Sequence, residues 1–281
     1  MKLALFFPVP RAAGIWELEK TAESALQVME KIKNPNTEIV PCFPEKGVVT
    51  PIEHCYRYLV YHADMEMYKA AIQMERDGFD AIMLSCWLDP ALPQMRQALN
   101  IPVVGVGQSS MLFANIMGDK FSLIPQNDII IPQLKEVIER SGLQSKVASI
   151  RPITLPDEEH VKSLEDAHAL IADFQNVSRQ CIADGAEVIL VGCMLVATAL
   201  AVAPKCEKEY PSGLQEIDGV PVVDNLAVML KAAESAVALK DAGFPWISRK
   251  QTYARADREL EANSREPFFD DTPAYFTLAR T

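Results

Sequence analysis

Strand-like and helix-like hydrophobic patterns alternate along the chain. Short runs of apolar, often β-branched residues predict buried strands at 3–7, 37–43, 81–85, 103–106, 121–124 and 147–153. Between these runs, apolar residues return at helical spacing, as over 17–33, 52–76 and 132–141. Such alternation predicts an α/β fold with mostly parallel sheets flanked by helices.

One ten-residue pattern occurs twice and organises this alternation. DGFDAIMLSC runs from Asp77 to Cys86, and DGAEVILVGC runs from Asp184 to Cys193. Each copy joins a turn to a buried strand, and a cysteine follows that strand. A helix-compatible stretch and a second short strand come next, NIPVVGVG in the first case and GVPVVDN in the second. The two copies therefore predict two related βαβ units.

The repeats divide the chain into two pseudo-symmetric lobes. We expect residues 1–118 to form the first lobe and residues 119–242 the second, with part of the last core helix able to return to the first. Residues 243–281 are polar, and we expect them to form a C-terminal arm over a lobe or a neighbouring subunit. The aromatic residues of this arm are Trp246, Tyr253, Phe268, Phe269, Tyr275 and Phe276.

Composition and charge narrow the class of protein. The 281 residues are 49% hydrophobic, which is enough to bury a sizeable core. Net charge is −11 and no basic run stands out, so nucleic acid and anionic membrane surfaces are poor partners. The uncharged run 188–204 falls short of the roughly 20 residues of a membrane span. MKLALFFPVP suits a first strand better than a signal peptide, so we expect a cytoplasmic protein with reduced thiols. We also expect the protein to form a homo-oligomer and to bind a small molecule as its substrate.

Cys86 and Cys193 are the candidate catalytic residues. Each follows a buried strand and precedes a predicted helix, at the sheet edge where α/β proteins bind ligands. Because N–H groups at a helix N-terminus favour a thiolate, we expect each thiol pKa to fall from ~8.5 to about 7. Either cysteine alone could be a small buried hydrophobe, but their matched positions favour two thiols in one pocket. Neither the histidines nor the other cysteines show zinc-type spacing, so we expect no metal site.

Several polar residues near these cysteines are predicted helix caps. Asp89 follows Cys86 closely, and Asp224 precedes the last core helix. Gln108, Ser109 and Ser110 are candidates to cap the helix after the strand at 103–106.

Several segments match motifs of a known family. After the first repeat strand the chain reads CWLDP over 86–90, a Cys, aromatic, any, Asp, Pro motif. IPVVGVGQSSM, GDKFSLI and GVPVVDN match further segments, and Pro-Ile-Glu at 51–53 matches a Ser-Ile-Glu loop. Over about residues 1–242 the chain thus resembles the aspartate/glutamate racemase superfamily, and within it the hydantoin racemase branch. The resemblance implies a two-lobed, cofactor-free enzyme in which Cys86 and Cys193 flank the substrate's acidic carbon.

The expected pocket departs from the family pattern toward apolar residues. Phe7-Pro8-Val9 stands where the family has Asn-Pro-Asn, and Pro125 replaces a threonine. Met194 and Leu195 follow the second cysteine, where small residues are usual. A polar group without partners would cost on the order of 1–3 kcal/mol there, so an amino acid diacid is a poor substrate. We expect the substrate-binding residues to be Phe7, Val9, Trp87, Pro125 and Met194.

The predicted function is a cofactor-independent racemase or epimerase acting at an acidic carbon next to a carbonyl, in particular in a 5-substituted hydantoin with an apolar group. One cysteine removes the proton as a thiolate, and the other delivers one as a thiol. A decarboxylase or a cis-trans isomerase on the same scaffold is the alternative chemistry. A non-catalytic small-molecule binding protein is the alternative of a different class, because a fold alone does not imply activity.

Overall fold

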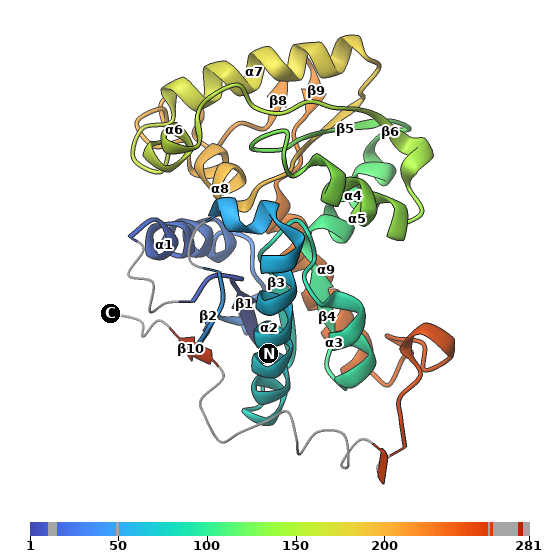
Figure 1. Ribbon diagram of the computed structural model, residues 1–281. Coiled ribbons are helices and arrows are strands. Elements are labelled where there is room, and N and C mark those ends of the chain that lie inside the picture. The colour runs from blue at the N-terminus through green and yellow to red at the C-terminus, as the bar shows by residue number, and fades with distance from the viewer. Residues whose placement is uncertain (11–15, 49–50, 258, 261–274, 278–281) are drawn as a thin grey trace.

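Strands and helices alternate through the protein as the hydrophobic pattern predicts (Figure 1). The computed structural model describes residues 1–10, 16–48, 51–257, 259–260 and 275–277. The helices are α1 (Trp16–Glu30), α2 (Arg57–Arg76), α3 (Leu92–Ala98), α4 (Val106–Met117), α5 (Ile131–Arg140), α6 (Asp157–Lys162), α7 (His168–Ala183), α8 (Met194–Val202) and α9 (Asn225–Asp241). The short 3-10 helices are η2 (Pro51–Cys55), η3 (Gln144–Lys146) and η4 (Gln251–Tyr253).

The first sheet has the strand order β10-β2-β1-β3-β4. Its strands are β1 (Lys2–Phe6), β2 (Glu38–Pro44), β3 (Ala81–Leu84), β4 (Val103–Gly105) and β10 (Tyr275–Thr277). β1 to β4 are parallel, and β10 joins the edge at β2 in the antiparallel direction. All four residues of β3 are buried, as expected for a parallel strand covered on both faces. The carboxyl ends of β1 and β3 therefore open at one edge of this sheet.

The second sheet is parallel, with the strand order β6-β5-β7. It consists of β5 (Phe121–Ile124), β6 (Val147–Ile150) and β7 (Val188–Val191). The segment GVPVVDN was predicted to be a strand of a βαβ unit. It contains β9 (Val220–Pro221), which pairs in the antiparallel direction with β8 (Glu216–Ile217), and Val222 forms a single bridge to Ile189 of β7. Pro221 has no N–H to donate to a ladder, which limits this segment as a strand.

The two repeats have the same local structure. In each, a long helix ends at an Asp-Gly turn, a four-residue strand follows, and a cysteine lies two residues beyond the strand's last residue. The turn glycines Gly78 and Gly185 have φ angles of +79° and +99°, a backbone conformation that residues other than glycine adopt at an energetic cost. This order of elements, shared by the two repeats, places Cys86 just after β3 and Cys193 just after β7.

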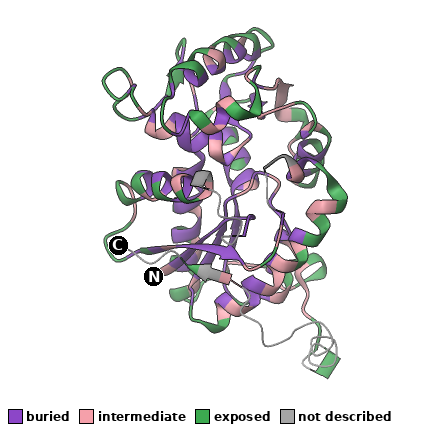
Figure 2. Ribbon diagram, turned by 60° about the vertical axis from the view of Figure 1, so that its left-hand side comes forward, coloured by how far each residue is buried: buried purple, intermediate pink, exposed green. Residues whose placement is uncertain are grey.

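The last core helix returns to the first sheet. Leu226, Met229 and Leu230 of α9 are buried in the same cluster as Leu5 of β1 and Met83 of β3. Figure 2 shows buried residues along the inner segments of the ribbon and exposed residues on the outer faces of the helices. The protein has the mixed α/β architecture that the sequence predicts, while the residue bounds of the two lobes stay a prediction.

Part of the C-terminal arm folds back onto the first lobe. The guanidinium of Arg249 donates to the carbonyl oxygens of Arg96 and Leu99 at the end of α3. Tyr275 donates from its hydroxyl to Asp77 at 2.6 Å, and β10 pairs with β2. Phe268 and Phe269, named above as aromatic residues of this arm, lie outside the described residues. In the part of the chain that the structure describes, no helix is long and apolar enough to cross a bilayer.

Candidate active site

The loop that carries Cys86 is fastened to the start of α4. Asp89 is buried, and its two carboxylate oxygens accept from the backbone N–H groups of Gly107 at 2.9 Å and Gln108 at 2.8 Å. Asp89 also has a φ of +49°, a conformation that Asp adopts more readily than most residues. The carboxylate thus caps a helix that lies farther along the chain and fixes the path of the loop.

The predicted caps of α4 were wrong. The helix begins at Val106, so Gln108, Ser109 and Ser110 lie inside it instead of at its start. Ser109 turns its hydroxyl back to the carbonyl oxygen of Gly105, as serine does within a helix. Two N–H groups of the first turn, those of Gly107 and Gln108, already have Asp89 as their acceptor. The prediction for Asp224 is confirmed, because its carboxylate accepts from the N–H groups of Leu226 and Ala227, both at 3.0 Å.

Cys193 is the N-cap residue of α8. The N–H groups of Leu195 and Val196, in the first turn of that helix, lie close enough to the thiol to favour its ionised form. The helix itself is apolar and buried, which is why it packs into the second lobe's core directly behind the cysteine. The fold therefore presents this thiol at a helix N-terminus, as the sequence predicts.

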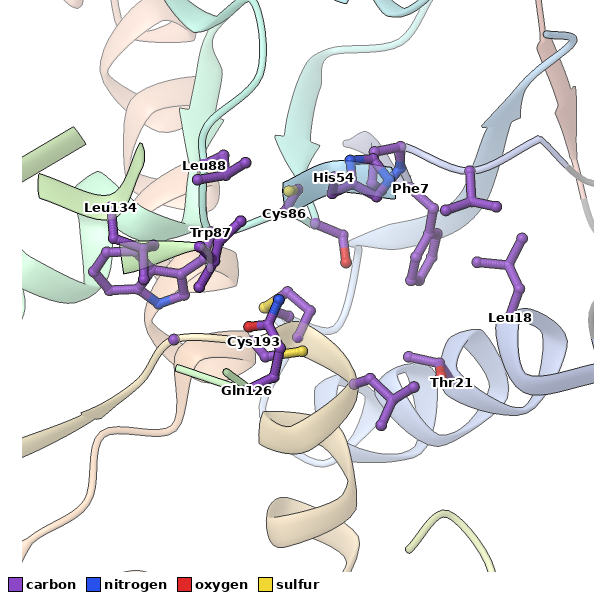
Figure 3. Close-up of a pocket in the computed structure, with 17 residues that line it drawn as sticks. Phe7, Leu18, Thr21, His54, Cys86, Trp87, Leu88, Gln126, Leu134 and Cys193 are labelled. Carbon is purple, nitrogen blue, oxygen red and sulfur yellow. The ribbon is translucent and has the colours of Figure 1, made fainter. Parts of the chain in front are cut away.

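Both thiols line one pocket (Figure 3). Its cavity volume is about 130 Å³, room for a small organic molecule and not just one or two waters. The walls come from the ends of β1, β3 and β7, from α1 and α5, and from η2 and the segment after β5. The lining residues are Phe7, Pro8, Val9, Leu18, Thr21, His54, Ser85, Cys86, Trp87, Leu88, Gln126, Ile130, Leu134, Gly192, Cys193, Met194 and Leu195.

Four of the five residues predicted to bind substrate line this pocket. They are Phe7, Val9, Trp87 and Met194. The ring of Phe7 stacks on Phe43 with their centroids 5.2 Å apart, which holds it in the wall.

Pro125 does not line the pocket. Its carbonyl oxygen accepts from the N–H of Ile153, and its backbone packs closely against Gly192. The next residue, Gln126, lines the pocket instead.

The electrostatics of the thiols differ from the sequence prediction. Burial raises the pKa of the Cys86 thiol to about 12, and the N–H of Leu88 opposes this rise. The charges of Asp89, Cys193 and Asp64 raise the pKa further, so the two thiols lie within electrostatic reach of one another. Burial also raises the pKa of Cys193, against the N–H groups of α8. The expected fall of the thiol pKa to about 7 was wrong, because desolvation of the two buried thiols outweighs the effect of the helix N-terminus.

The described wall of the pocket is uncharged as well as apolar. Among the lining residues that the structure describes, none is Asp, Glu, Lys or Arg. Within the described ranges, no group of three or more His, Cys, Asp or Glu side chains is placed to hold a metal ion. The thiols are therefore the groups in this pocket best suited to exchange protons with a bound molecule.

Sequence reasoning missed several lining residues. The histidines were considered only as possible metal ligands, and Gln126 was not considered, although His54 and Gln126 both reach the pocket. Gln126 lies two residues beyond the end of β5, which is the offset of Cys86 from β3 and of Cys193 from β7. This shared offset was a signal in the sequence. No sequence pattern pointed to Leu18 and Thr21, since they reach the pocket from the outside helix α1.

Known racemases resemble this chain in sequence and in fold. The family model described as Asp/Glu/Hydantoin racemase matches residues 53–233. A hydantoin racemase from Pseudomonas sp. (strain NS671) is 27% identical over 271 residues, covering 95% of this chain and 97% of the relative. An allantoin racemase from Klebsiella pneumoniae has a TM-score of 0.71 at 20% identity and covers 92% of this chain and 94% of that structure. The allantoin racemase from Pseudomonas fluorescens has a TM-score of 0.65 at 24% identity, covering 92% and 97%.

The family model spans both cysteine-bearing loops and most of the strands that form the pocket. The two solved structures share the fold over nearly the whole chain. The chain therefore belongs to the Asp/Glu/hydantoin racemase family, a family of isomerases, as the sequence motifs predict.

Proposed function

We propose that the protein is a cofactor-independent racemase that inverts an acidic carbon next to a carbonyl, in a 5-substituted hydantoin or a related compound with an apolar group. The observation that carries this proposal is that Cys86 and Cys193, from matched repeats, line one largely apolar pocket. Two acid–base groups are what inversion at carbon requires, because the proton must leave one face and return to the other.

The reaction needs one ionised and one protonated thiol. A thiolate takes the proton from the substrate carbon and becomes a thiol, while the opposite thiol gives its proton and becomes a thiolate. The charge that develops on the substrate's carbonyl oxygen can be stabilised by backbone N–H groups after each cysteine. Atoms and charge balance without a metal or an organic cofactor, and the enzyme ends with the two protonation states exchanged.

The walls of the pocket favour an apolar substituent on an uncharged ring. Phe7, Trp87 and Met194 are almost fully buried and offer hydrocarbon or aromatic surface. A free amino acid would bring an ammonium and two or more carboxylate oxygens against a wall whose described residues carry no charged side chain. Burying such charges without partners is costly, so the neutral ring compound should bind better.

The direct test follows single enantiomers of alkyl- and benzyl-substituted hydantoins in D₂O. We expect loss of optical rotation together with uptake of one deuterium at the inverted carbon, and no comparable turnover of aspartate or glutamate. A chelator should leave the rate unchanged. Release of CO₂ from a malonate derivative, or a preference for the amino acids, would contradict the proposal, and binding without exchange would support a non-catalytic binding protein.

The rate should rise with pH above neutrality. Raised thiol pKa values mean that both cysteines are mostly protonated at pH 7, so the thiolate is the scarce form. Below the pKa its fraction grows roughly tenfold per pH unit, and we expect kcat/KM to grow with it between about pH 7 and 9. The rate rises with pH because the thiol pKa values are shifted upward. Thiol pKa values lowered below 7 would instead give a kcat/KM that does not change between pH 7 and 9.

Alkylation provides a measurement that does not depend on ionisation of the substrate. Iodoacetamide should modify Cys86 and Cys193 slowly at pH 7 and faster at pH 9, as followed by mass spectrometry of the two peptides. A pH-independent rate of both racemisation and alkylation would show that the thiolates already exist at neutral pH.

A further inference from the structure

The wall of the apolar pocket contains buried polar atoms for which the described residues offer no hydrogen-bond partner. Seven buried side-chain nitrogen or oxygen atoms lack a hydrogen bond among the described residues, and four of them belong to residues that line this pocket. These four are His54 Nε2, Ser85 Oγ, Trp87 Nε1 and Gln126 Oε1. Because an unsatisfied buried polar group is unfavourable, their concentration in one cavity indicates that a bound molecule supplies the missing partners.

Two of these groups approach from different parts of the fold. His54 lies in η2, and its carbonyl oxygen accepts from Gln133 of α5 at 3.1 Å, which fixes the backbone below the ring. Gln126 follows β5 in the second sheet. Figure 3 draws His54 on the side of the pocket that carries Cys86, and Gln126 on the side that carries Cys193. A ligand between the two thiols would therefore be within reach of both side chains.

The chemistry of the four groups suits an uncharged ring amide. Burial lowers the pKa of His54 to about 4, against the charge of Glu53, so its ring is neutral at pH 7 and can donate one hydrogen bond and accept another. Trp87 Nε1 can only donate, whereas Gln126 Oε1 can only accept. A ligand that carries both carbonyl and N–H groups can pair with the donors and with the acceptors of the pocket wall. A carboxylate could accept from the donors but has no hydrogen to give to Gln126 Oε1.

We propose that His54 and Gln126 are specificity-determining residues of this site, which hydrogen-bond the carbonyl and N–H groups of an uncharged cyclic amide and turn its acidic carbon toward the thiols. The inference rests on the proposed racemase function and assigns its substrate recognition. Neither residue exchanges a proton with the substrate carbon. His54 and Gln126 supply the polar contacts that the apolar replacements at Phe7 and Val9 removed from the first strand's end.

The test combines side-chain variants with altered ligands. His54→Leu and Gln126→Leu should each raise KM roughly 3- to 10-fold, the equivalent of one lost neutral hydrogen bond, with a smaller change in kcat. His54→Gln keeps a neutral donor and acceptor, and should recover most of the loss. The same substitutions in exposed residues, His62→Leu and Gln144→Leu, are the matched controls and should leave KM unchanged.

A structural role is excluded by the ligand series. Wild type should prefer 5-benzylhydantoin over its N1-methyl and N3-methyl derivatives, because methylation removes one N–H from the ring. Gln126→Leu should lose the preference against one of these derivatives while keeping the other. If every variant keeps the wild-type KM and the wild-type preferences, the assignment of His54 and Gln126 is wrong.

Failure of this inference differs from failure of the proposed function. An active wild type with unaffected variants overturns only the recognition residues. A wild type that neither racemises nor exchanges deuterium with any hydantoin overturns the function, and with it the inference. Should His54→Leu fail to fold, as judged by thermal melting, His54→Gln and Gln126→Leu still decide the result.

Discussion

Cys86→Ser and Cys193→Ser should each abolish net racemisation. A hydroxyl has a pKa far above that of a thiol, so a serine can neither take nor give the proton at working pH. Loss of one general acid–base group typically lowers the rate by roughly 10²–10⁴. Because inversion uses one group on each face of the substrate carbon, we expect the racemisation rate of both variants to fall by this factor. The change in optical rotation of a single enantiomer measures this rate.

The two variants should still differ from one another. Each retains one thiol, so each can exchange the substrate proton with D₂O for the enantiomer whose hydrogen faces that thiol. Cys86→Ser and Cys193→Ser should therefore show opposite enantiomer preferences in deuterium uptake, read by NMR or mass spectrometry. This pairing of a lost reaction with a retained half-reaction would separate proton-transfer defects from misfolding.

Cys181→Ser is the matched control. Its thiol interacts with the hydroxyls of Ser122 and Ser149 in the second lobe, so a serine hydroxyl fits the same surroundings. Cys181 does not line the pocket, and we expect its variant to keep the wild-type rate. If Cys86→Ser or Cys193→Ser racemised normally, the two-base assignment would be wrong, and chemistries that need a single cysteine would account better for the site.

The fold was largely predictable because its signals are local. Buried parallel strands read as short β-branched runs, and the Asp-Gly turns mark the start of β3 and β7. The repeat then pairs Cys86 with Cys193, since matched positions in related βαβ units lie at matched strand ends. The segment before α9 was predicted less well. Pro221 interrupts its strand pattern, and Asp224 caps the start of α9 only three residues later.

The site was less predictable because it depends on distant contacts. Asp89 was predicted to cap a helix, but it caps α4 from a loop that precedes this helix by many residues, so no local motif revealed which helix it caps. The raised pKa of Cys86 depends on burial by several elements, which a helix N-terminus in the sequence does not reveal. Pro125 was chosen by alignment to a family threonine, whereas the strand-end offset selects Gln126.

The last expected result concerns the Asp89 carboxylate. Asp89→Ala should leave the buried N–H of Gly107 and the partly buried N–H of Gln108 without an acceptor, and a buried group left in this way costs about 1–3 kcal/mol. We expect the free energy of unfolding to fall by about 2–4 kcal/mol in denaturant titrations, together with a loss of kcat, because the loop carrying Cys86 and Trp87 loses its anchor. Asp89→Asn keeps one acceptor and tolerates positive φ, so its loss should be smaller.

Asp218→Ala isolates the part of this effect that comes from the carboxylate. Asp218 has a φ of +50°, close to the +49° of Asp89, so both substitutions carry the same backbone penalty for alanine. Asp218 is exposed, however, and its carboxylate accepts from Arg179 at the surface instead of from buried N–H groups. Surface ion pairs contribute little, and we expect Asp218→Ala to be far milder and fully active. Equal losses of stability in the two variants would mean that the backbone conformation, and not the buried cap, holds the Cys86 loop in place.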